Sequence, residues 1–112
     1  MKLNKNMKIA CICRGGQVRS VCARYILNDM FGFRKVLAAG WEKNDPDTIK
    51  MLCHWADAVL IVGSATKWLN NNSIPPEFKH KYVLLDIGED VWHHYNNKEL
   101  VKILGNLLEK MI

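Results

Sequence analysis

The amino-acid sequence predicts an α/β fold, a four-stranded parallel sheet with helices on both faces in a three-layer, Rossmann-like arrangement. Short apolar runs of strand length alternate along the chain with segments in which apolar residues recur at helical spacing. One run, Ala58 to Val62, is apolar throughout, as is typical of a strand buried on both faces of a parallel sheet. No internal repeat or linker interrupts this alternation, so residues 1–112 are predicted to form a single domain.

The first predicted strand is Ile9 to Cys13, and a loop containing Gly15-Gly16 separates it from a helix. Apolar side chains that recur from Val18 to Met30 indicate this helix, and Gly32 is expected to end it. Arg34 to Ala39 is the second predicted strand. The three elements together form a β-α-β unit whose helix directly follows the glycine loop.

The next helix is predicted to begin after Asp45, whose side chain caps it, with Pro46 in its first turn and its end near Trp55. Ala58 to Val62 is then the third strand, and a short helix is expected from Thr66 to Asn71. The alternation of strand and helix therefore continues into the second half of the chain.

The last part of the chain supplies one more strand and one more helix. Ser73 to Pro76 is predicted to be a loop because of its Ser and Pro-Pro content, and Tyr82 to Ile87 is the fourth strand. One face of a C-terminal helix is lined by the apolar residues Leu100, Leu104, Leu107, Leu108 and Met111.

The predicted topology also places the functional residues. In open parallel sheets, right-handed crossovers bring the C-terminal ends of the strands to one edge, where ligands bind. Four loops are expected to converge there, comprising residues 14–19, 40–43, 63–66 and 88–94.

The charge and the cysteines narrow the class of protein. The formal net charge is +5, but no basic stripe with interleaved aromatic residues is present, so nucleic-acid binding is not favoured and a phosphorylated ligand suits the charge equally well.

The apolar run near the N-terminus is too short to span a membrane, so we expect a cytoplasmic protein with no membrane partner. Reduced thiols are then expected for the four cysteines, Cys11, Cys13, Cys22 and Cys53.

The strongest functional signal is the segment Cys13-Arg14-Gly15-Gly16-Gln17-Val18-Arg19-Ser20. It lies between a strand and a helix, where backbone N–H groups and the helix dipole favour an anion. The glycines permit tight curvature, and Arg19 returns at the rim, where its planar fork can bind two phosphate oxygens. We therefore interpret residues 13–20 as a phosphate-binding loop in which Arg14, Gly15, Gly16, Gln17, Val18 and Ser20 contact the ligand.

Cys13 is predicted to be a nucleophile, because cysteines at helix N-termini beside an arginine are often thiolates near neutral pH. Ser20 is placed to donate a hydrogen bond to the sulfur and to stabilise the thiolate when it leaves a phosphocysteine intermediate. The alternative interpretation is that Cys13 ends a buried strand and that Gly15-Gly16 is an ordinary turn.

Residues 13–20 resemble the active-site loop of the low-molecular-weight protein tyrosine phosphatases, which also follows the first strand. Ala38-Ala39-Gly40 is similar to the Ser-Ala-Gly segment that follows the second strand of that family, and Trp55-Ala56-Asp57-Ala58-Val59-Leu60 is similar to the Trp-Ala-Asp segment that enters its third strand. The resemblance covers most of the chain and implies a phosphotyrosine phosphatase I-like fold. It implies a phosphomonoester hydrolase that acts on phosphotyrosine or a related aryl phosphate through a cysteinyl-phosphate intermediate, with Cys13 as nucleophile and Arg19 as phosphate clamp.

The resemblance also implies a general acid, an aspartate after the fourth strand. Asp90 is the candidate and Asp86 the reserve, since a carboxyl group there would protonate the leaving oxygen and then activate water. The alternative is that Asp90 caps a turn. Trp41 and Trp92 are expected to flank the loop and stack on an aryl phosphate, and core packing is the alternative for both.

Three residues depart from the family pattern. Gly16 and Ala38 replace an asparagine and a serine that brace the family's loop, and Val18 replaces a second loop cysteine. The chain is also shorter between the third strand and the C-terminal helix. A looser loop and low activity are therefore expected, and a non-catalytic phosphate-binding module stays an alternative.

Two further functions are compatible with a cysteine after the first strand. A thiol-dependent arsenate reductase needs a resolving cysteine, for which Cys53 is badly placed, and a sugar-transport phosphocarrier is less compatible with Arg19. No cofactor is expected. Metal binding is not favoured, because the adjacent His93 and His94 point apart on a regular element and no Cys-x2-Cys pair is present. The expected partner is a phosphorylated small molecule or a phosphotyrosine protein.

Overall fold

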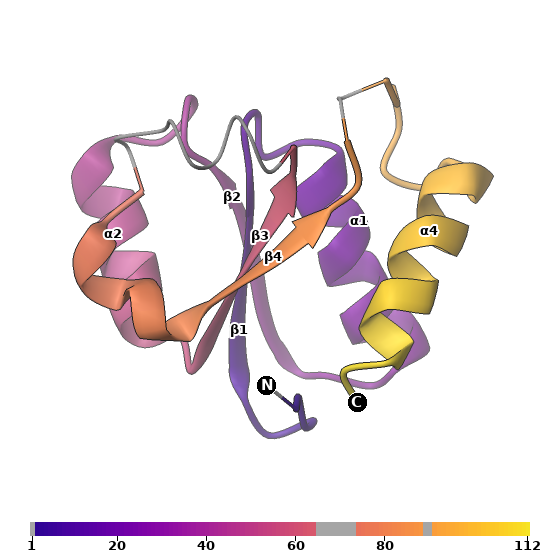
Figure 1. Ribbon diagram of the computed structural model, residues 1–112, viewed down its shortest axis with the longest axis horizontal. Helices are drawn as coiled ribbons and strands as arrows, with labels where there is room; N and C mark the ends of the chain where they lie inside the picture. Colours follow the sequence, from indigo (N-terminus) through magenta and orange to yellow (C-terminus); the bar gives the residue numbers. More distant parts are fainter. Residues whose placement is uncertain (1, 65–73, 89–90) are drawn as a thin grey trace.

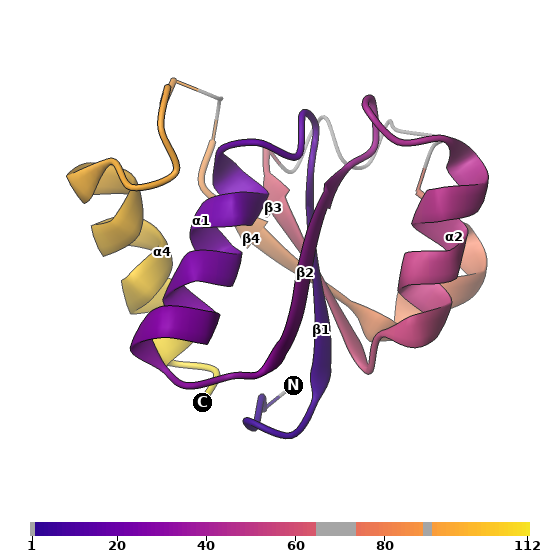
Figure 2. The ribbon, with the colours of Figure 1, turned by 180° about the vertical axis from the view of Figure 1, so that it is seen from behind.

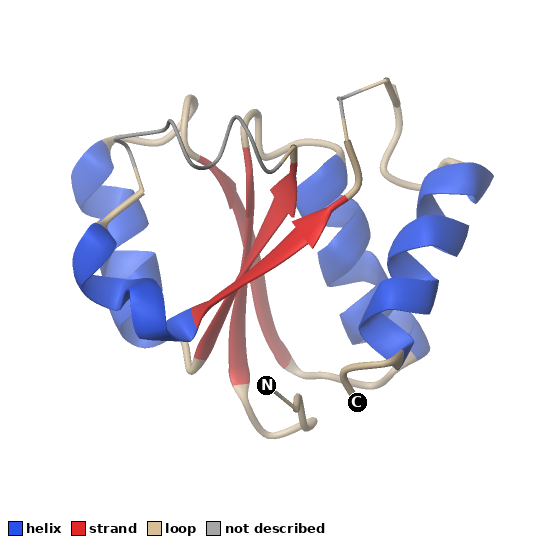
Figure 3. Ribbon diagram, in the orientation of Figure 1, coloured by secondary structure: helices blue, strands red, loops and turns tan. Residues whose placement is uncertain are grey.

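The computed structural model describes residues 2–64, 74–88 and 91–112. Its secondary structure follows the order strand, helix, strand, helix, strand, 3₁₀ helix, strand, helix (Figures 1 and 3). The elements are β1 (Lys8–Cys13), α1 (Arg19–Tyr25), a π-helical turn (Ile26–Met30), β2 (Lys35–Gly40), α2 (Pro46–Trp55), β3 (Ala58–Gly63), a 3₁₀ helix (Pro76–Lys81), β4 (Tyr82–Asp86) and α4 (Lys98–Glu109).

The strands form one parallel sheet in the order β2-β1-β3-β4. Helices α1 and α4 cover one face of the sheet, and α2 with the 3₁₀ helix covers the other (Figures 1 and 2). The predicted fold class, a four-stranded parallel sheet with helices on both faces, is therefore confirmed. No helix among the described residues is long and apolar enough to cross a membrane.

The core is divided by the sheet into two clusters because successive side chains of a strand point to opposite faces. In β1, Ile9, Cys11 and Cys13 point into the cluster under α1 and α4, whereas Ala10 and Ile12 point into the cluster under α2. Strand β3 is buried along its whole length, as its unbroken apolar sequence predicts. Cys13 therefore enters the site from the α1 side of the sheet.

The predicted helices are found with two differences. The predicted helix that starts near Val18 is α-helical only as far as Tyr25 and continues as a π-helical turn, after which Gly32 adopts a φ of 78°. The 3₁₀ helix that begins at Pro76 is an addition to the predicted elements, because a proline that favours a loop also suits the first turn of a helix. The short helix predicted over residues 66–71 lies outside the described residues.

Side-chain caps fix where the longer helices begin. Asp45 caps α2 by accepting a hydrogen bond from the Thr48 N–H at 2.8 Å, which confirms the predicted cap, and Pro46 occupies the first turn. Asn97 caps α4 in the same way, accepting hydrogen bonds from the backbone N–H groups of Glu99 at 3.0 Å and Leu100 at 3.2 Å. The cap of α2 matters for the site because it immediately follows the loop after β2.

Candidate active site

The C-terminal ends of the four parallel strands lie at one edge of the sheet, at the top of Figure 1. Cys13, Gly40, Gly63 and Asp86 are the last residues of β1, β2, β3 and β4. The loops that follow the first two strands lie against each other, because the Trp41 N–H donates a hydrogen bond to the Cys13 carbonyl oxygen at 3.1 Å. The edge at which the sequence predicts a ligand therefore carries the cysteine, two of the glycines and one acidic residue.

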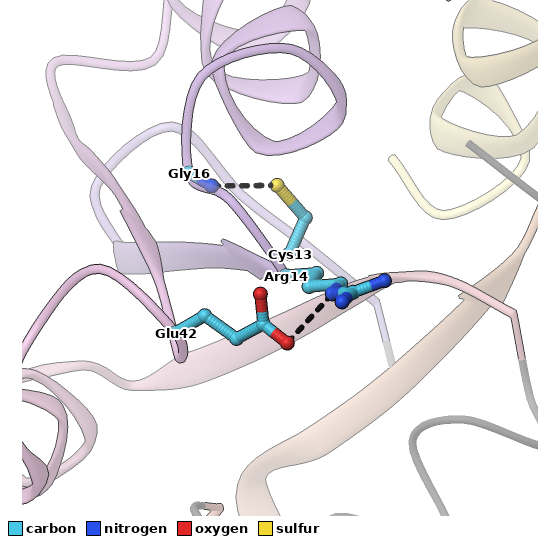
Figure 4. Close-up of polar contacts among 4 residues, drawn as sticks. All are labelled: Cys13, Arg14, Gly16 and Glu42. Atoms are coloured by element: carbon cyan, nitrogen blue, oxygen red, sulfur yellow. Dashed lines mark hydrogen bonds and ion pairs between the residues drawn. The ribbon is translucent and has the colours of Figure 1, made fainter. Parts of the chain in front are cut away.

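The sulfur of Cys13 makes two polar contacts within its own loop. The Gly16 N–H donates to the sulfur at 3.2 Å (Figure 4), and the Cys13 thiol donates to the Ser20 hydroxyl oxygen at 3.1 Å. The side chain is 2% exposed, so the sulfur lies at the bottom of the loop and not on the outer surface. The three predicted site residues Cys13, Gly16 and Ser20 are thus brought together.

The tight course of this loop depends on two glycines whose backbones touch. Gly16 has a φ of 69°, a backbone conformation that residues other than glycine rarely adopt. A Cβ atom on Gly16 would lie 2.4 Å from the Gly40 backbone nitrogen, and a Cβ atom on Gly40 would lie 2.4 Å from the backbone of Gly15 and Gly16. The Glu42 N–H also donates to the Arg14 carbonyl oxygen at 3.0 Å. The end of β2 therefore supports the cysteine loop directly.

Arg19 and Ser20 begin α1 and are the buried polar or charged side chains found in the described part of the chain. Charged side chains are seldom buried unless they are paired or belong to a functional site. The burial of Arg19 beside Ser20 therefore indicates a functional site at this edge of the sheet. The Arg19 guanidinium lies beside Gly63 at the end of β3, where a Cβ atom would come within 2.7 Å of its Nη1 atom. Gly63 therefore leaves the space that the guanidinium occupies.

Arg14 is directed elsewhere. Its Nε atom donates to the Glu42 carboxylate at 2.7 Å, in an ion pair whose side chains are 50% and 48% exposed, and Figure 4 shows this pair pointing away from the Cys13 sulfur. Gln17 is exposed, and Gly15 and Val18 are partly exposed. The structure thus separates Arg14, held by an acidic neighbour, from Arg19, buried beside the strand ends.

The two tryptophans predicted to flank the loop are packed in the core. Trp41 is 7% exposed in the cluster under α2, and Trp92 is 9% exposed in the cluster under α1 and α4. Their burial favours the packing alternative over an aromatic wall. Asp86 is exposed and accepts a hydrogen bond from the Gly88 N–H at 3.1 Å, as a turn residue does. Asp90, the predicted general acid, lies outside the described residues.

The other cysteines differ from Cys13 in their surroundings, although all four are free thiols. Cys11 and Cys22 lie in the same cluster as Cys13, and burial raises the pKa of both thiols, that of Cys22 to about 12. Burial also raises the pKa of Cys53, which lies in the cluster on the opposite face of the sheet. The sheet therefore separates Cys53 from Cys13, which argues against Cys53 as a resolving thiol.

Asn44 is a residue of this edge that sequence reasoning missed. Its Oδ1 atom accepts a hydrogen bond from the Gly40 N–H at 3.1 Å, and its own N–H donates to the Gly40 carbonyl oxygen at 3.0 Å. The only signal in the sequence is that an asparagine before Asp45 favours a turn. Its partner at Gly40 follows from the fold and not from spacing.

No protein-family model, curated protein or solved structure matches the chain. In the described ranges, no group of three His, Cys, Asp or Glu side chains is placed to hold a metal ion. The resemblance to low-molecular-weight tyrosine phosphatases therefore stays a prediction based on residues 13–20, 38–40 and 55–60.

Proposed function

We propose that the protein is a phosphomonoester hydrolase that acts through a cysteinyl-phosphate intermediate on Cys13. The observation that supports this most is the placement of two hydrogen-bonding groups on one sulfur, the Gly16 N–H at 3.2 Å and the Ser20 hydroxyl at 3.1 Å. When the thiol loses its proton, the Ser20 hydroxyl can turn and donate to the sulfur, as the Gly16 N–H already does. Hydrogen bonds to a charged acceptor are about twice as strong as neutral ones, so both groups then stabilise the thiolate more than the thiol. A stabilised thiolate is both the better nucleophile and the better leaving group.

The position of Arg19 supplies the positive charge that a phosphate requires. Its guanidinium lies beside Gly63, at the same edge of the sheet as the Cys13 sulfur. A guanidinium presents its N–H groups in a planar fork that matches two oxygens of a phosphate, which a lysine does not. Pairing with a phosphate dianion also offsets the cost of keeping this charge out of water.

The proposed reaction has two displacements at phosphorus. In the first, the Cys13 thiolate attacks, the S–P bond forms, and the bond to the leaving oxygen breaks as Asp90 transfers its proton to that oxygen. In the second, water attacks phosphorus and gives a proton to the Asp90 carboxylate. The S–P bond then breaks, and Ser20 stabilises the released thiolate. The sum is an ester and water converted to an alcohol and inorganic phosphate.

The depth of the sulfur favours a phosphate carried on an extended group. Cys13 is 2% exposed, so phosphorus reaches the sulfur only when the phosphate enters the loop. A phosphotyrosine or another aryl phosphate holds its phosphorus farther from the peptide or ring substituents than a phosphoserine does. We therefore propose an aryl phosphate as the substrate class, in a phosphorylated small molecule or a phosphotyrosine protein.

The same burial supports a second candidate, a phosphate-binding module without turnover. A sulfur that contacts Gly16 and Ser20 has little free surface for attack on phosphorus, whereas the N–H groups and Arg19 suit an anion equally well. The two functions differ in one measurable property, because both bind phosphate and only one releases it from an ester.

The test is hydrolysis of para-nitrophenyl phosphate at mildly acidic to neutral pH, with and without vanadate, by the native chain, Cys13→Ser and Cys53→Ser. Cys53→Ser is the matched control, since it removes a buried thiol on the opposite face of the sheet. Turnover is expected in the native chain and in Cys53→Ser, and at least about a thousandfold less in Cys13→Ser, because nucleophile removal disables the whole catalytic unit. Asp90→Asn should slow esters with poor leaving groups most.

Each alternative predicts its own result. Equal turnover by Cys13→Ser and the native chain would contradict the mechanism. No turnover, together with a rise in melting temperature on adding phosphate or vanadate, would identify the binding module. Arsenate-dependent oxidation of added thiol without ester hydrolysis would identify a reductase.

A further inference from the structure

Asn44 holds the last residue of β2 by both of its backbone polar groups. The Trp41 N–H faces β1, where it donates to the Cys13 carbonyl oxygen, so the polar groups of Gly40, one residue earlier, face away from β1. At that outer side, Asn44 accepts the Gly40 N–H at 3.1 Å through Oδ1 and donates its own N–H to the Gly40 carbonyl oxygen at 3.0 Å. The Gly40 carbonyl oxygen also accepts the Lys43 N–H at 3.2 Å, whereas the Gly40 N–H is held by the Asn44 side chain. The peptide group on the N-terminal side of Gly40 is therefore oriented by the Asn44 side chain.

Gly40 is also the surface on which the cysteine loop rests. The backbones of Gly40 and Gly16 approach so closely that a Cβ atom on either would lie 2.4 Å from the other residue's nitrogen. Such a contact has no side chain that can adjust, so a displacement of Gly40 is transmitted to the loop. The position of Gly40 therefore determines the position of Gly16.

Gly16 in turn donates its N–H to the Cys13 sulfur at 3.2 Å. Hydrogen bonds weaken steeply when the donor moves out of line, so this contact depends on where the Gly16 peptide lies. We propose that Asn44 is a positioning residue of the Cys13 loop, which holds Gly40 and thereby holds the Gly16 N–H against the Cys13 sulfur. The effect on turnover rests on the proposed function, but the effect on loop geometry does not.

The competing role for Asn44 is purely structural. It directly precedes Asp45, the cap of α2, so its loss would also lower stability if it only shaped the turn before that helix. A loss of stability alone does not distinguish the two roles. The amides of Gly40 and Gly16 do distinguish them, because only the positioning role reaches residue 16.

The experiment is amide hydrogen exchange of Gly16 and Gly40 by NMR in the native chain, Asn44→Ala, Asn44→Asp and Asn97→Ala. Asn97→Ala is the matched control, since it removes another asparagine that accepts backbone hydrogen bonds, at the start of α4. In Asn44→Ala both glycine amides are expected to exchange at least about tenfold faster. In Asn97→Ala the exchange rates of these two amides, relative to those of the other strand amides, are expected to stay unchanged. In Asn44→Asp a carboxylate oxygen accepts the same hydrogen bond, so protection of Gly16 returns.

The affinity for inorganic phosphate gives a second readout, and we expect it to fall about tenfold in Asn44→Ala and to stay unchanged in Asn97→Ala. Unchanged protection of Gly16 in Asn44→Ala overturns the proposal even if the native chain hydrolyses esters. Faster exchange of Gly16 supports it even if the native chain hydrolyses none, so the two proposals fail separately. If Asn44→Ala does not fold, Asn44→Gln, which moves the oxygen by one methylene, carries the same expectation.

Discussion

The interior and the end of β1 each carry a cysteine on the same face of the strand. Cys11 lies within the ladder of β1. Burial raises the pKa of its thiol, the neighbouring Cys13 raises this pKa further, and Arg24 lowers it. Cys13 lies where the strand ends, and its sulfur receives the Gly16 N–H and contacts Ser20. Inside the sheet, backbone N–H groups are used by neighbouring strands, whereas beyond the last residue they are free to turn toward a side chain. The two cysteines thus differ in their hydrogen-bond partners because the ladder stops between them and the loop.

The glycines at the strand ends also differ from the glycine of the outer helix in the space around them. Gly40 and Gly16 are required because two backbones meet where the strands end, whereas Gly105 lies in α4 with nothing within 4 Å of its Cβ position. The end of the sheet is therefore built by close backbone contact, and the outer helix by side chains.

The largest expected effect comes from alanine at these glycines. Gly40→Ala places a methyl group 2.4 Å from the Gly15 and Gly16 backbone and should lower the free energy of unfolding by about 3 kcal/mol. Gly105→Ala has open space and should raise it by about 0.5–1 kcal/mol, because alanine favours a helix. Urea unfolding of both variants measures the difference. Effects of the same sign would show that backbone contact does not define the strand end.

The next effect is on thiol reactivity. At pH 8 the native protein should react with iodoacetamide at Cys13 at least about tenfold faster than at Cys11 or Cys22, because the Gly16 N–H and the Ser20 hydroxyl contact its sulfur, whereas burial raises the pKa of the other two thiols. Mass spectrometry of peptides after brief labelling measures the three rates, and labelling in urea, where all three thiols should react alike, is the control. Similar rates in the folded protein would remove the distinction between interior and end.

A smaller effect should separate the two arginines of the loop. Arg19→Ala should weaken phosphate binding about thirtyfold, because a buried charge-assisted hydrogen bond is worth about 2 kcal/mol. Arg14→Ala should change it about twofold at most, because Arg14 is half exposed and pairs with Glu42. Calorimetric titration with inorganic phosphate gives both values. Equal losses would mean that Arg14 leaves Glu42 to join the ligand.

The smallest effect concerns alkaline pH. The folded-state pKa values of Cys11 and Cys22 lie above their ordinary value near 9, so the folded protein keeps protons that the unfolded chain releases, and stability should fall as the pH rises above about 9. Cys22→Ala should make this decline shallower, while Gly105→Ala should leave its slope unchanged. Urea unfolding between pH 8 and pH 11 measures the slopes. An unaltered slope in Cys22→Ala would show that its burial does not hold the proton.

Most of the fold was predictable because its signals are local. Four apolar runs, the Asp45-Pro46 helix start and the apolar face of α4 each depend on neighbouring residues, and the structure has each of them. The π-helical turn at Ile26–Met30 was not predictable, because apolar spacing does not reveal which carbonyl group each N–H selects.

In the candidate site, too, the contacts between residues close in sequence were predictable and the contacts between different strand ends were not. Cys13, Gly16 and Ser20 lie within one short loop, so their spacing indicated that they would meet. Asn44 and Gly63 reach the loop from other strand ends, and the Arg14 ion pair joins residues on different loops, so these contacts depend on the register of the sheet. Sequence composition also cannot tell whether a tryptophan lines a ligand or packs in the core.

The outer edge of β2 has a consequence for self-association. A strand at the edge of a sheet offers unpaired backbone groups to other chains, which promotes polymerisation. On β2, Arg24 donates to the Val36 carbonyl oxygen at 3.0 Å. The Asn44 side chain accepts the Gly40 N–H, and the backbone N–H groups of Lys43 and Asn44 donate to the Gly40 carbonyl oxygen. A second strand would therefore meet blocked positions at both ends of an edge whose middle carries the 46% exposed Leu37. Asn44, which holds the loop, therefore also hinders the addition of a strand from another chain to this edge of the sheet.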